Sequence, residues 1–215
     1  MKYLLGFILL ISLHGLAQDQ DSVILVKGRY ITGLNGSISS QSVNGNILGG
    51  QVARKVNEYS IGTQSGYFIK DGWTMGLEFT LGKTEFRNPD LHVSAENVSI
   101  GLWSRYYFMR YYNGALFADL TPFYTVINEI NEIETTHFVF AEELHGKGYG
   151  IKPAIGFTYL INKNVGFGMS VAYQFGHVYA DRTNLILKTV TKEDYEFSQL
   201  SFNFSFQVYL DQFFF

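Results

Sequence analysis

The sequence contains no cysteine and only three prolines among its 215 residues. Without cysteine the chain can form no disulfide, thiolate metal site, cysteine nucleophile or lipidated lipoprotein anchor. Charged residues make up only 16%, and a net charge of −3 offers no basic footprint for nucleic acid. Beyond the N-terminal segment, no apolar run approaches the about 18 residues that indicate a transmembrane helix. These features exclude disulfide-linked, lipid-anchored, nucleic-acid-binding and helical membrane proteins.

Aromatic residues and glycine are frequent, with 15 Tyr, 19 Phe and 22 Gly. Residues 73–82, WTMGLEFTLG, alternate large apolar side chains with small or polar ones. Because successive side chains of a strand point to opposite faces, one face is wholly apolar and the other holds Gly, Thr and one Glu. The polar face of a soluble sandwich strand would carry more charges. The pattern therefore favours a crowded barrel lumen on one face and lipid on the other.

Residues 1–17 form a segment of a different kind. Lys2 precedes an apolar run over residues 3–13, and small residues follow at Gly15 and Ala17. An N-terminal membrane anchor is the alternative, but the run is shorter than the roughly 20 residues that span a bilayer. We interpret residues 1–17 as a secretory signal peptide cleaved before Gln18. Residues 18–215 are then one exported barrel domain, which points to a bacterial outer membrane.

The alternating pattern predicts eight strands, an even number as bacterial barrels require. Their expected ranges are 23–35, 58–69, 73–83, 94–109, 115–127, 147–160, 165–177 and 195–210. Short turns at 70–72, 111–114 and 161–164 alternate with longer segments at 36–57, 85–91, 128–146 and 178–194. Since periplasmic turns are short and extracellular loops long, the short turns and both termini are expected on the periplasmic side.

Three stretches resemble the small eight-stranded outer-membrane barrels of the OmpA/OmpX type. They are SGYFIKDGWTMGLEF at residues 65–79, RYYF at 105–108 and IGFTYLINKNVGFGMSVAYQF at 155–175. The resemblance implies an all-β, eight-stranded antiparallel up-and-down transmembrane β-barrel in the bacterial outer membrane. Its implied partners are outer-membrane lipid and the barrel-assembly machinery. Phe213 and Phe215 are out of phase with the last strand, so either a bulge lies near Asp211 or the strand ends at Leu210.

Few charges are in phase with the lumen: Lys27, Arg29, Glu78, Arg105, Asp119 and Lys152. Counting from the short turns puts Glu78, Arg105 and Asp119 at similar heights, so one arginine could bind two carboxylates. We interpret five of them, Arg29, Glu78, Arg105, Asp119 and Lys152, as a structural charge network. Buried charges need partners, and eight strands leave room only for side chains. The alternative is a gated path for ions.

No catalytic, cofactor or metal site is predicted. Ser170 and His177 are on opposite faces of one strand, roughly 20 Å apart at about 3.3 Å per residue. The acidic residues of segment 129–143, with His137 and His145, lack the spacing of a metal-binding loop. Pro122 cannot donate to the ladder and predicts a local irregularity or bulge. Seven aromatic residues are assigned to membrane-interface girdles: Tyr59, Tyr67, Trp73, Tyr106, Tyr124, Tyr159 and Tyr173.

The expected function is a structural or adhesion-like role at the cell surface, through four extracellular loops. HFVF at 137–140 and NLILKTVT at 184–191 indicate that two pairs of strands continue beyond the membrane. Protruding strand edges can recruit a strand of a surface or host protein. A narrow channel for ions or small solutes is the first alternative. A lipid-modifying enzyme is a weaker one, because no nucleophile lies near a base.

Overall fold

The computed structural model describes residues 24–47, 50–88, 91–111, 113–135 and 138–211. The predicted signal peptide, Phe213 and Phe215 lie outside these residues. No helix in these ranges is long and apolar enough to cross a bilayer. The strands are β1 (Tyr30–Ile47), β2 (Gly50–Lys70), β3 (Trp73–Asn88), β4 (Leu91–Tyr111), β5 (Gly114–Thr135), β6 (Phe138–Asn162), β7 (Val165–Asn184) and β8 (Thr189–Leu210).

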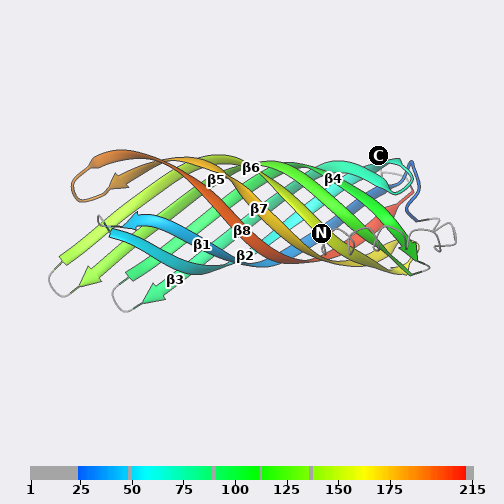
Figure 1. The fold of residues 1–215 in the computed structure, drawn as a ribbon, viewed down its shortest axis with the longest axis horizontal. Helices are drawn as coiled ribbons and strands as arrows, with labels where there is room; N and C mark the ends of the chain where they lie inside the picture. The colour runs from blue at the N-terminus through cyan, green and yellow to red at the C-terminus, as the bar shows by residue number, and fades with distance from the viewer. Residues whose placement is uncertain (1–23, 48–49, 89–90, 112, 136–137, 212–215) are drawn as a thin grey trace, which may run out of the picture.

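Each strand pairs antiparallel with the next, and β1 pairs with β8, so the sheet closes into a barrel (Figure 1). The predicted eight-stranded up-and-down barrel is confirmed. We call the end with the turn at residues 71–72, the turn at 163–164 and the segment 24–29 the base. The opposite end, where β1–β2, β3–β4, β5–β6 and β7–β8 turn back, is the apex. The strand β8 ends at Leu210, as one of the two predictions for the C-terminus required.

Two of the long segments that were predicted as loops, 36–57 and 85–91, are mostly strand, so that part of the prediction was wrong. β1 runs to Ile47 and β2 starts at Gly50, through the segment 36–57 that is rich in Ser, Gly and Asn. Backbone groups in this segment are satisfied by pairing between β1 and β2, from Tyr30↔Tyr67 to Ile47↔Gly50. Pairing overrides the low strand propensity of these residues. The predicted extensions of the fifth to eighth strands are confirmed, because β5 reaches Thr135 and β8 begins at Thr189.

The first strand starts later than predicted. Residues 24–29 form turns ahead of β1, and Gly28 has a positive φ of 97°, which breaks an extended strand. Lys27 is consequently an exposed turn residue and not a lumen charge. The irregularity predicted at Pro122 is present as a gap in the β4–β5 ladder, because no residues pair between Gly101↔Phe123 and Ser104↔Leu120. It is not a bulge, since the register is the same on both sides of the gap and shifts only between Tyr107 and Met109. Proline has no backbone N–H to donate to the ladder.

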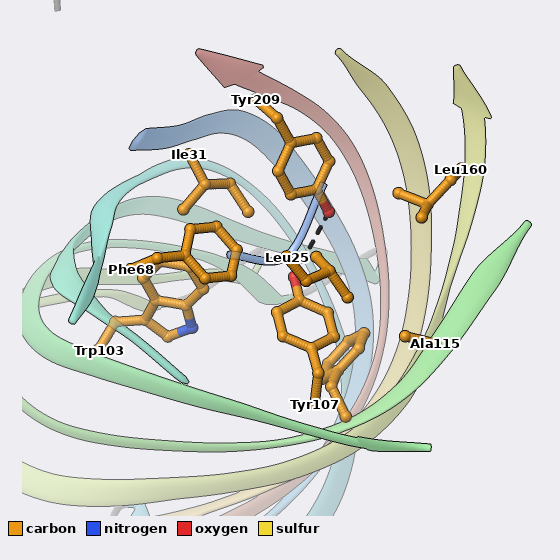
Figure 2. Packing of buried hydrophobic residues seen from close by; sticks show 9 residues of the cluster. Leu25, Ile31, Phe68, Trp103, Tyr107, Ala115, Leu160 and Tyr209 are labelled. Atoms are coloured by element: carbon orange, nitrogen blue, oxygen red, sulfur yellow. Dashed lines mark hydrogen bonds between the residues drawn. The ribbon is translucent and has the colours of Figure 1, made fainter. Parts of the chain in front are cut away.

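The two faces of the wall match the predicted phases. Outward side chains of β7 are large, apolar and exposed, as in Phe167, Met169 and Val171, whereas the inward Ala172 is buried. Inward side chains at the base form one apolar cluster, shown in Figure 2. The cluster consists of Leu25, Ile31, Phe68, Trp103, Tyr107, Ala115, Phe117, Leu160 and Tyr209. A smaller cluster of Leu144, Val178 and Ala180 lies toward the apex. The lumen is therefore filled by side chains, as eight strands require.

Candidate functional site

Arg29 joins the segments that meet at the base. Its guanidinium donates to the carbonyl oxygens of Ile24 (3.2 Å), Lys163 (2.9 Å) and Tyr209 (3.2 Å). Its Nε lies 2.7 Å from the Asp211 carboxylate. Arg29 is buried while Asp211 is exposed, so the ion pair reaches from the lumen to the surface. One side chain thus holds the first described residues, the β6–β7 turn and the end of β8.

The segment before β1 covers the mouth of the base. Leu25 is completely buried among the aromatic side chains of the base cluster. Its carbonyl accepts a hydrogen bond from the Gly72 amide (2.7 Å), and the Lys27 amide donates to Asp71 Oδ1 (2.7 Å). The hydroxyls of Tyr107 and Tyr209 lie 3.4 Å apart inside the cluster (Figure 2). The base is therefore sealed by apolar packing that the N-terminal segment completes.

Arg105 and Asp119 form a buried, bidentate ion pair on β4 and β5. Nε lies 2.7 Å from Oδ1 and Nη2 lies 2.8 Å from Oδ2. Arg105 is only 2% exposed, and its guanidinium carbon lies 3.7 Å from the centre of the Phe117 ring. The aromatic ring and the fork-like pairing both favour a fully charged arginine there. The two side chains are in contact because the β4–β5 register places Arg105 directly opposite Asp119.

Glu78 does not join this pair, although the sequence predicted that it would. Its carboxylate forms an ion pair with Lys152 of β6, on the opposite side of the lumen. Gln64 Nε2 (2.8 Å) and Thr80 Oγ1 (3.2 Å) also donate to it. The five predicted charges therefore fall into three separate pairs, with Asp211 as the partner of Arg29. Their role as a structural element stays a prediction.

Glu58 is a lumen charge that sequence reasoning missed. It is buried on β2, where Oε1 accepts from Asn97 Nδ2 (2.8 Å) and Oε2 from Gln199 Nε2 (2.9 Å). Gly82 makes room for it, because a Cβ there would lie 2.4 Å from Oε1. The sequence did contain a signal for it: Tyr59 was assigned to the outer face, and the residue before it on a strand must then point into the lumen. The residue was missed because strand 2 was expected to start there.

A small polar chamber lies above the base cluster. Glu58, Glu78, Lys152 and Thr121 are among its lining residues, and its volume is about 50 Å³. That volume holds roughly three to five water molecules, at the 10–15 Å³ that each requires. Thr121 is 1% exposed, and its Oγ1 has no hydrogen-bond partner among the described protein atoms. The chamber is therefore suited to bound water between charged pairs.

Exposed aromatic residues gather at two levels of the outer wall. Tyr67, Trp73, Tyr106 and Tyr159 are near the base turns, whereas Tyr59, Tyr124 and Tyr173 are nearer the apex. On β2, the eight residues from Tyr59 to Tyr67 cover about 26 Å of strand, or about 20 Å along the axis of a barrel tilted by roughly 40°. That spacing is close to the apolar band of about 25 Å found in outer-membrane barrels. All seven predicted girdle residues face outward.

The structure does not bring Ser170 and His177 together. Ser170 Oγ accepts from Asn203 (3.2 Å), while His177 lies 3.8 Å from Asp194. No group of three or more His, Cys, Asp or Glu side chains is placed to hold a metal in the part of the chain that the structure describes. His145 contacts Asn128 (2.8 Å). His137 lies outside the described residues.

Neither a protein family model nor a curated protein matches the chain by sequence. Among solved structures, the outer membrane protein OprG from Pseudomonas aeruginosa matches with a TM-score of 0.58 at 15% identity, over 86% of this chain and 97% of that one. The chain has the fold of a small outer-membrane β-barrel. The outer membrane protein AlkL, solved in lipid bilayers, matches with a TM-score of 0.50 at 9% identity, over 86% and 91% of the two chains. Both structures agree with the outer-membrane location that the sequence predicts.

The apex of this β-barrel departs from a closed cylinder. Pairing between β8 and β1 ends at Gln199↔Gln41, whereas β8 stays paired with β7 as far as Thr189↔Asn184. Residues 189–198 therefore pair with β7 on one edge, and no described strand pairs with their other edge. Pairing between β2 and β3 likewise ends at Glu58↔Thr84. The barrel thus opens above the membrane-sized band into a sheet of β3–β8 and a separate β1–β2 ribbon (Figure 1).

An arginine holds three apical strands together. Arg182 of β7 donates from Nε and Nη2 to both oxygens of Glu193 (2.9 and 3.0 Å), and from Nη1 to Glu142 (3.0 Å). Burial opposes the charge of Arg182, but the hydrogen bonds to the two carboxylates outweigh it and raise the pKa of Arg182. The pairing fixes β6, β7 and β8 to one another within the region where β8 is no longer paired with β1.

Proposed function

We propose that this protein is a surface-contact protein, in which the closed barrel is the outer-membrane anchor and the apical strands reach outside the cell to bind a partner. The observation that carries the proposal is the unpaired edge of β8 over residues 189–198. Its ten residues offer backbone donors and acceptors that another extended chain can use. In this orientation the base faces the periplasm. Outer-membrane lipid and the barrel-assembly machinery are its proposed membrane partners.

The edge is regular enough to accept a strand. The β7–β8 register stays the same from Val165↔Val208 to Asn184↔Thr189, so no bulge twists the edge away. Natural proteins protect exposed edges with proline and with charged side chains, above all lysine. Residues 189–198 contain no proline and one lysine, Lys192, beside three acidic residues, Glu193, Asp194 and Glu196. Arg182 holds the strand from the other side through Glu193. The partner that fits is an extended peptide segment, bound by strand addition.

The lumen favours contact over transport. The base cluster fills the barrel below the polar chamber, and Arg29 ties its three segments together. A narrow channel is the alternative, and the polar chamber is the observation that favours it. Transport would require Leu25 and its aromatic neighbours to leave the lumen. An enzyme of lipid modification has less support, since Ser170 and His177 lie on opposite faces of the wall.

Proline substitution can test the edge without breaking the barrel. The Tyr209 amide donates to Asn164 on the β7 side, so odd-numbered residues of β8 pair with β7. Even-numbered residues then direct their amides to the free edge. Asp194→Pro and Glu196→Pro should therefore remove two free donors while leaving the β7–β8 ladder in place. The matched controls are Asp194→Asn and Glu196→Gln, which change the same charges but keep both amides.

The measurement uses the protein in nanodiscs and a displayed library of random linear peptides. Wild type and the controls should select extended peptides, and the double proline variant should bind them at least tenfold more weakly. Equal binding by all variants, or selection of no peptide, would contradict strand addition. Single-channel steps in planar bilayers with the wild-type protein would instead favour the channel.

A further inference from the structure

The tip of the β7–β8 hairpin carries an exposed aliphatic patch. Leu185, Ile186, Leu187 and Val190 are 47%, 53%, 71% and 62% exposed. The hairpin projects at the apical end of the molecule, drawn in orange at the left of Figure 1. Isolated exposed aliphatic residues are common, but a contiguous group at a projecting tip indicates an interaction site.

The tip is held in a fixed shape. Asn184 Oδ1 accepts hydrogen bonds from the amides of Ile186 (3.0 Å) and Leu187 (2.8 Å), which forms an Asx turn. The Leu185 amide donates to the Ala141 carbonyl of β6 (2.9 Å), and Lys188 adopts a positive φ of 52°. The aliphatic side chains are thus presented outward by an ordered turn, and little conformational entropy is lost when they bind.

The end of the hairpin carries positive charge. Residues 184–192 contain Lys188 and Lys192 and no acidic residue. Lys188 lies in the turn itself, whereas Lys192 is opposite Asp181 on β7 and is followed by Glu193 and Asp194. Aliphatic side chains flanked by lysines are suited to the boundary between acyl chains and anionic headgroups. Each lysine can extend its ammonium to a phosphate while its stem stays in apolar surroundings. A peptide partner would be expected to meet backbone groups, which the β8 edge offers and the tip does not.

The tip points away from the membrane that holds the barrel. On β7 it begins twelve residues beyond the girdle residue Tyr173, or about 40 Å farther along the strand. We propose that the tip inserts Leu185, Ile186 and Leu187 into an apposed lipid surface that carries negative charge, with Lys188 and Lys192 on the headgroups. This inference rests on the proposed function only in placing the apex outside the cell.

Vesicle binding tests the proposal with the full protein in zwitterionic nanodiscs. Phosphatidylcholine vesicles that contain one quarter phosphatidylglycerol should capture the wild type, and high salt should weaken capture. Ile186→Asp with Leu187→Asp should lower capture at least tenfold, and Lys188→Gln with Lys192→Gln about tenfold. Ile130→Asp is the matched control, an exposed aliphatic residue of β5 away from the tip, and should bind as wild type. Heat-modified gel migration checks that each variant is folded.

Insertion can be followed with a fluorescent label at a single site. Because the chain has no cysteine, one introduced cysteine is the only thiol that the label can react with. A Leu187→Cys variant carrying an environment-sensitive dye should shift to the blue with anionic vesicles and stay unshifted with pure phosphatidylcholine. Unchanged emission, or equal capture of the wild type and the Ile186→Asp, Leu187→Asp variant, would overturn the proposal. Capture of the wild type by lipid-free, protein-coated surfaces but not by vesicles would also overturn the proposal. The Asp194→Pro, Glu196→Pro variant should leave vesicle capture intact. The proposal for the tip and the proposal for the β8 edge can therefore fail independently of each other.

Discussion

The base and the apex of this barrel are made of the same eight strands but differ in how those strands are paired. At the base β1 pairs with β8, and the lumen is filled by the nine side chains of the base cluster. At the apex β8 loses β1 over residues 189–198, and aliphatic side chains face solvent. The difference separates two tasks. Closure and stability belong to the base, and contact with partners is proposed for the apex.

Breaking the buried pair nearest the base should have the largest effect on stability. Asp119→Ala leaves Arg105 without its bidentate partner at 2% exposure, which costs about 3–5 kcal/mol. The double variant Arg105→Met, Asp119→Leu should recover much of that loss, because well-packed apolar residues can replace a buried pair. Urea unfolding in detergent micelles, followed by circular dichroism, measures both. A double variant no more stable than the single one would contradict this account.

Two identical leucine truncations compare the ends directly. Leu25 is fully buried at the base, and Leu187 is 71% exposed at the apex. We expect Leu25→Ala to lower the free energy of unfolding by about 2–4 kcal/mol, from lost burial and the cavity left behind. Leu187→Ala should change it by less than about 0.5 kcal/mol, as exposed substitutions do. The same urea titration serves for both. Similar losses at the two positions would remove the distinction between the ends.

Among the buried lumen charges, the smallest effect is expected at Glu58, midway between the ends. Its hydrogen bonds come from the amides of Asn97 and Gln199, which can reverse their orientation to meet a new amide. Glu58→Gln should therefore change the free energy of unfolding by about 1 kcal/mol or less. Glu78→Gln is the comparison, because it leaves Lys152 without its carboxylate and should cost more. Urea unfolding should give a higher midpoint for Glu58→Gln than for Glu78→Gln, and the reverse order would contradict the prediction.

The faces of the strands could be predicted from the sequence because alternation is a local property. Trp103 and Tyr107 are buried and Leu102 and Tyr106 exposed, as their phase required. Strand ends were harder to predict. In the segment 36–57 local propensity indicates a loop, but pairing between β1 and β2 continues through it. Strand pairing depends on residues that are far apart in the sequence, and the local strand propensity of a segment carries no information about them.

The contacts among lumen charges were predicted only in part, for a geometric reason. Strands in a barrel are tilted and staggered, so equal distances from the turns do not place residues side by side. Arg105 meets Asp119 because adjacent strands pair them directly. Glu78 meets Lys152 across the lumen, from β3 to β6, which no neighbour-by-neighbour register reveals. Lys27 was misplaced because the positive φ of Gly28 ends the extended chain.

The contacts of Arg29 also impose an order in time on how the barrel is made. Its guanidinium binds the Tyr209 carbonyl, 180 residues later in the chain, and the Asp211 carboxylate beyond it. A growing or translocating chain exposes Arg29 early and these acceptors almost last. The full set of Arg29 contacts therefore cannot form until the end of β8 is present. A chain that stops after β7 would leave Arg29 with only the carbonyls of Ile24 and Lys163.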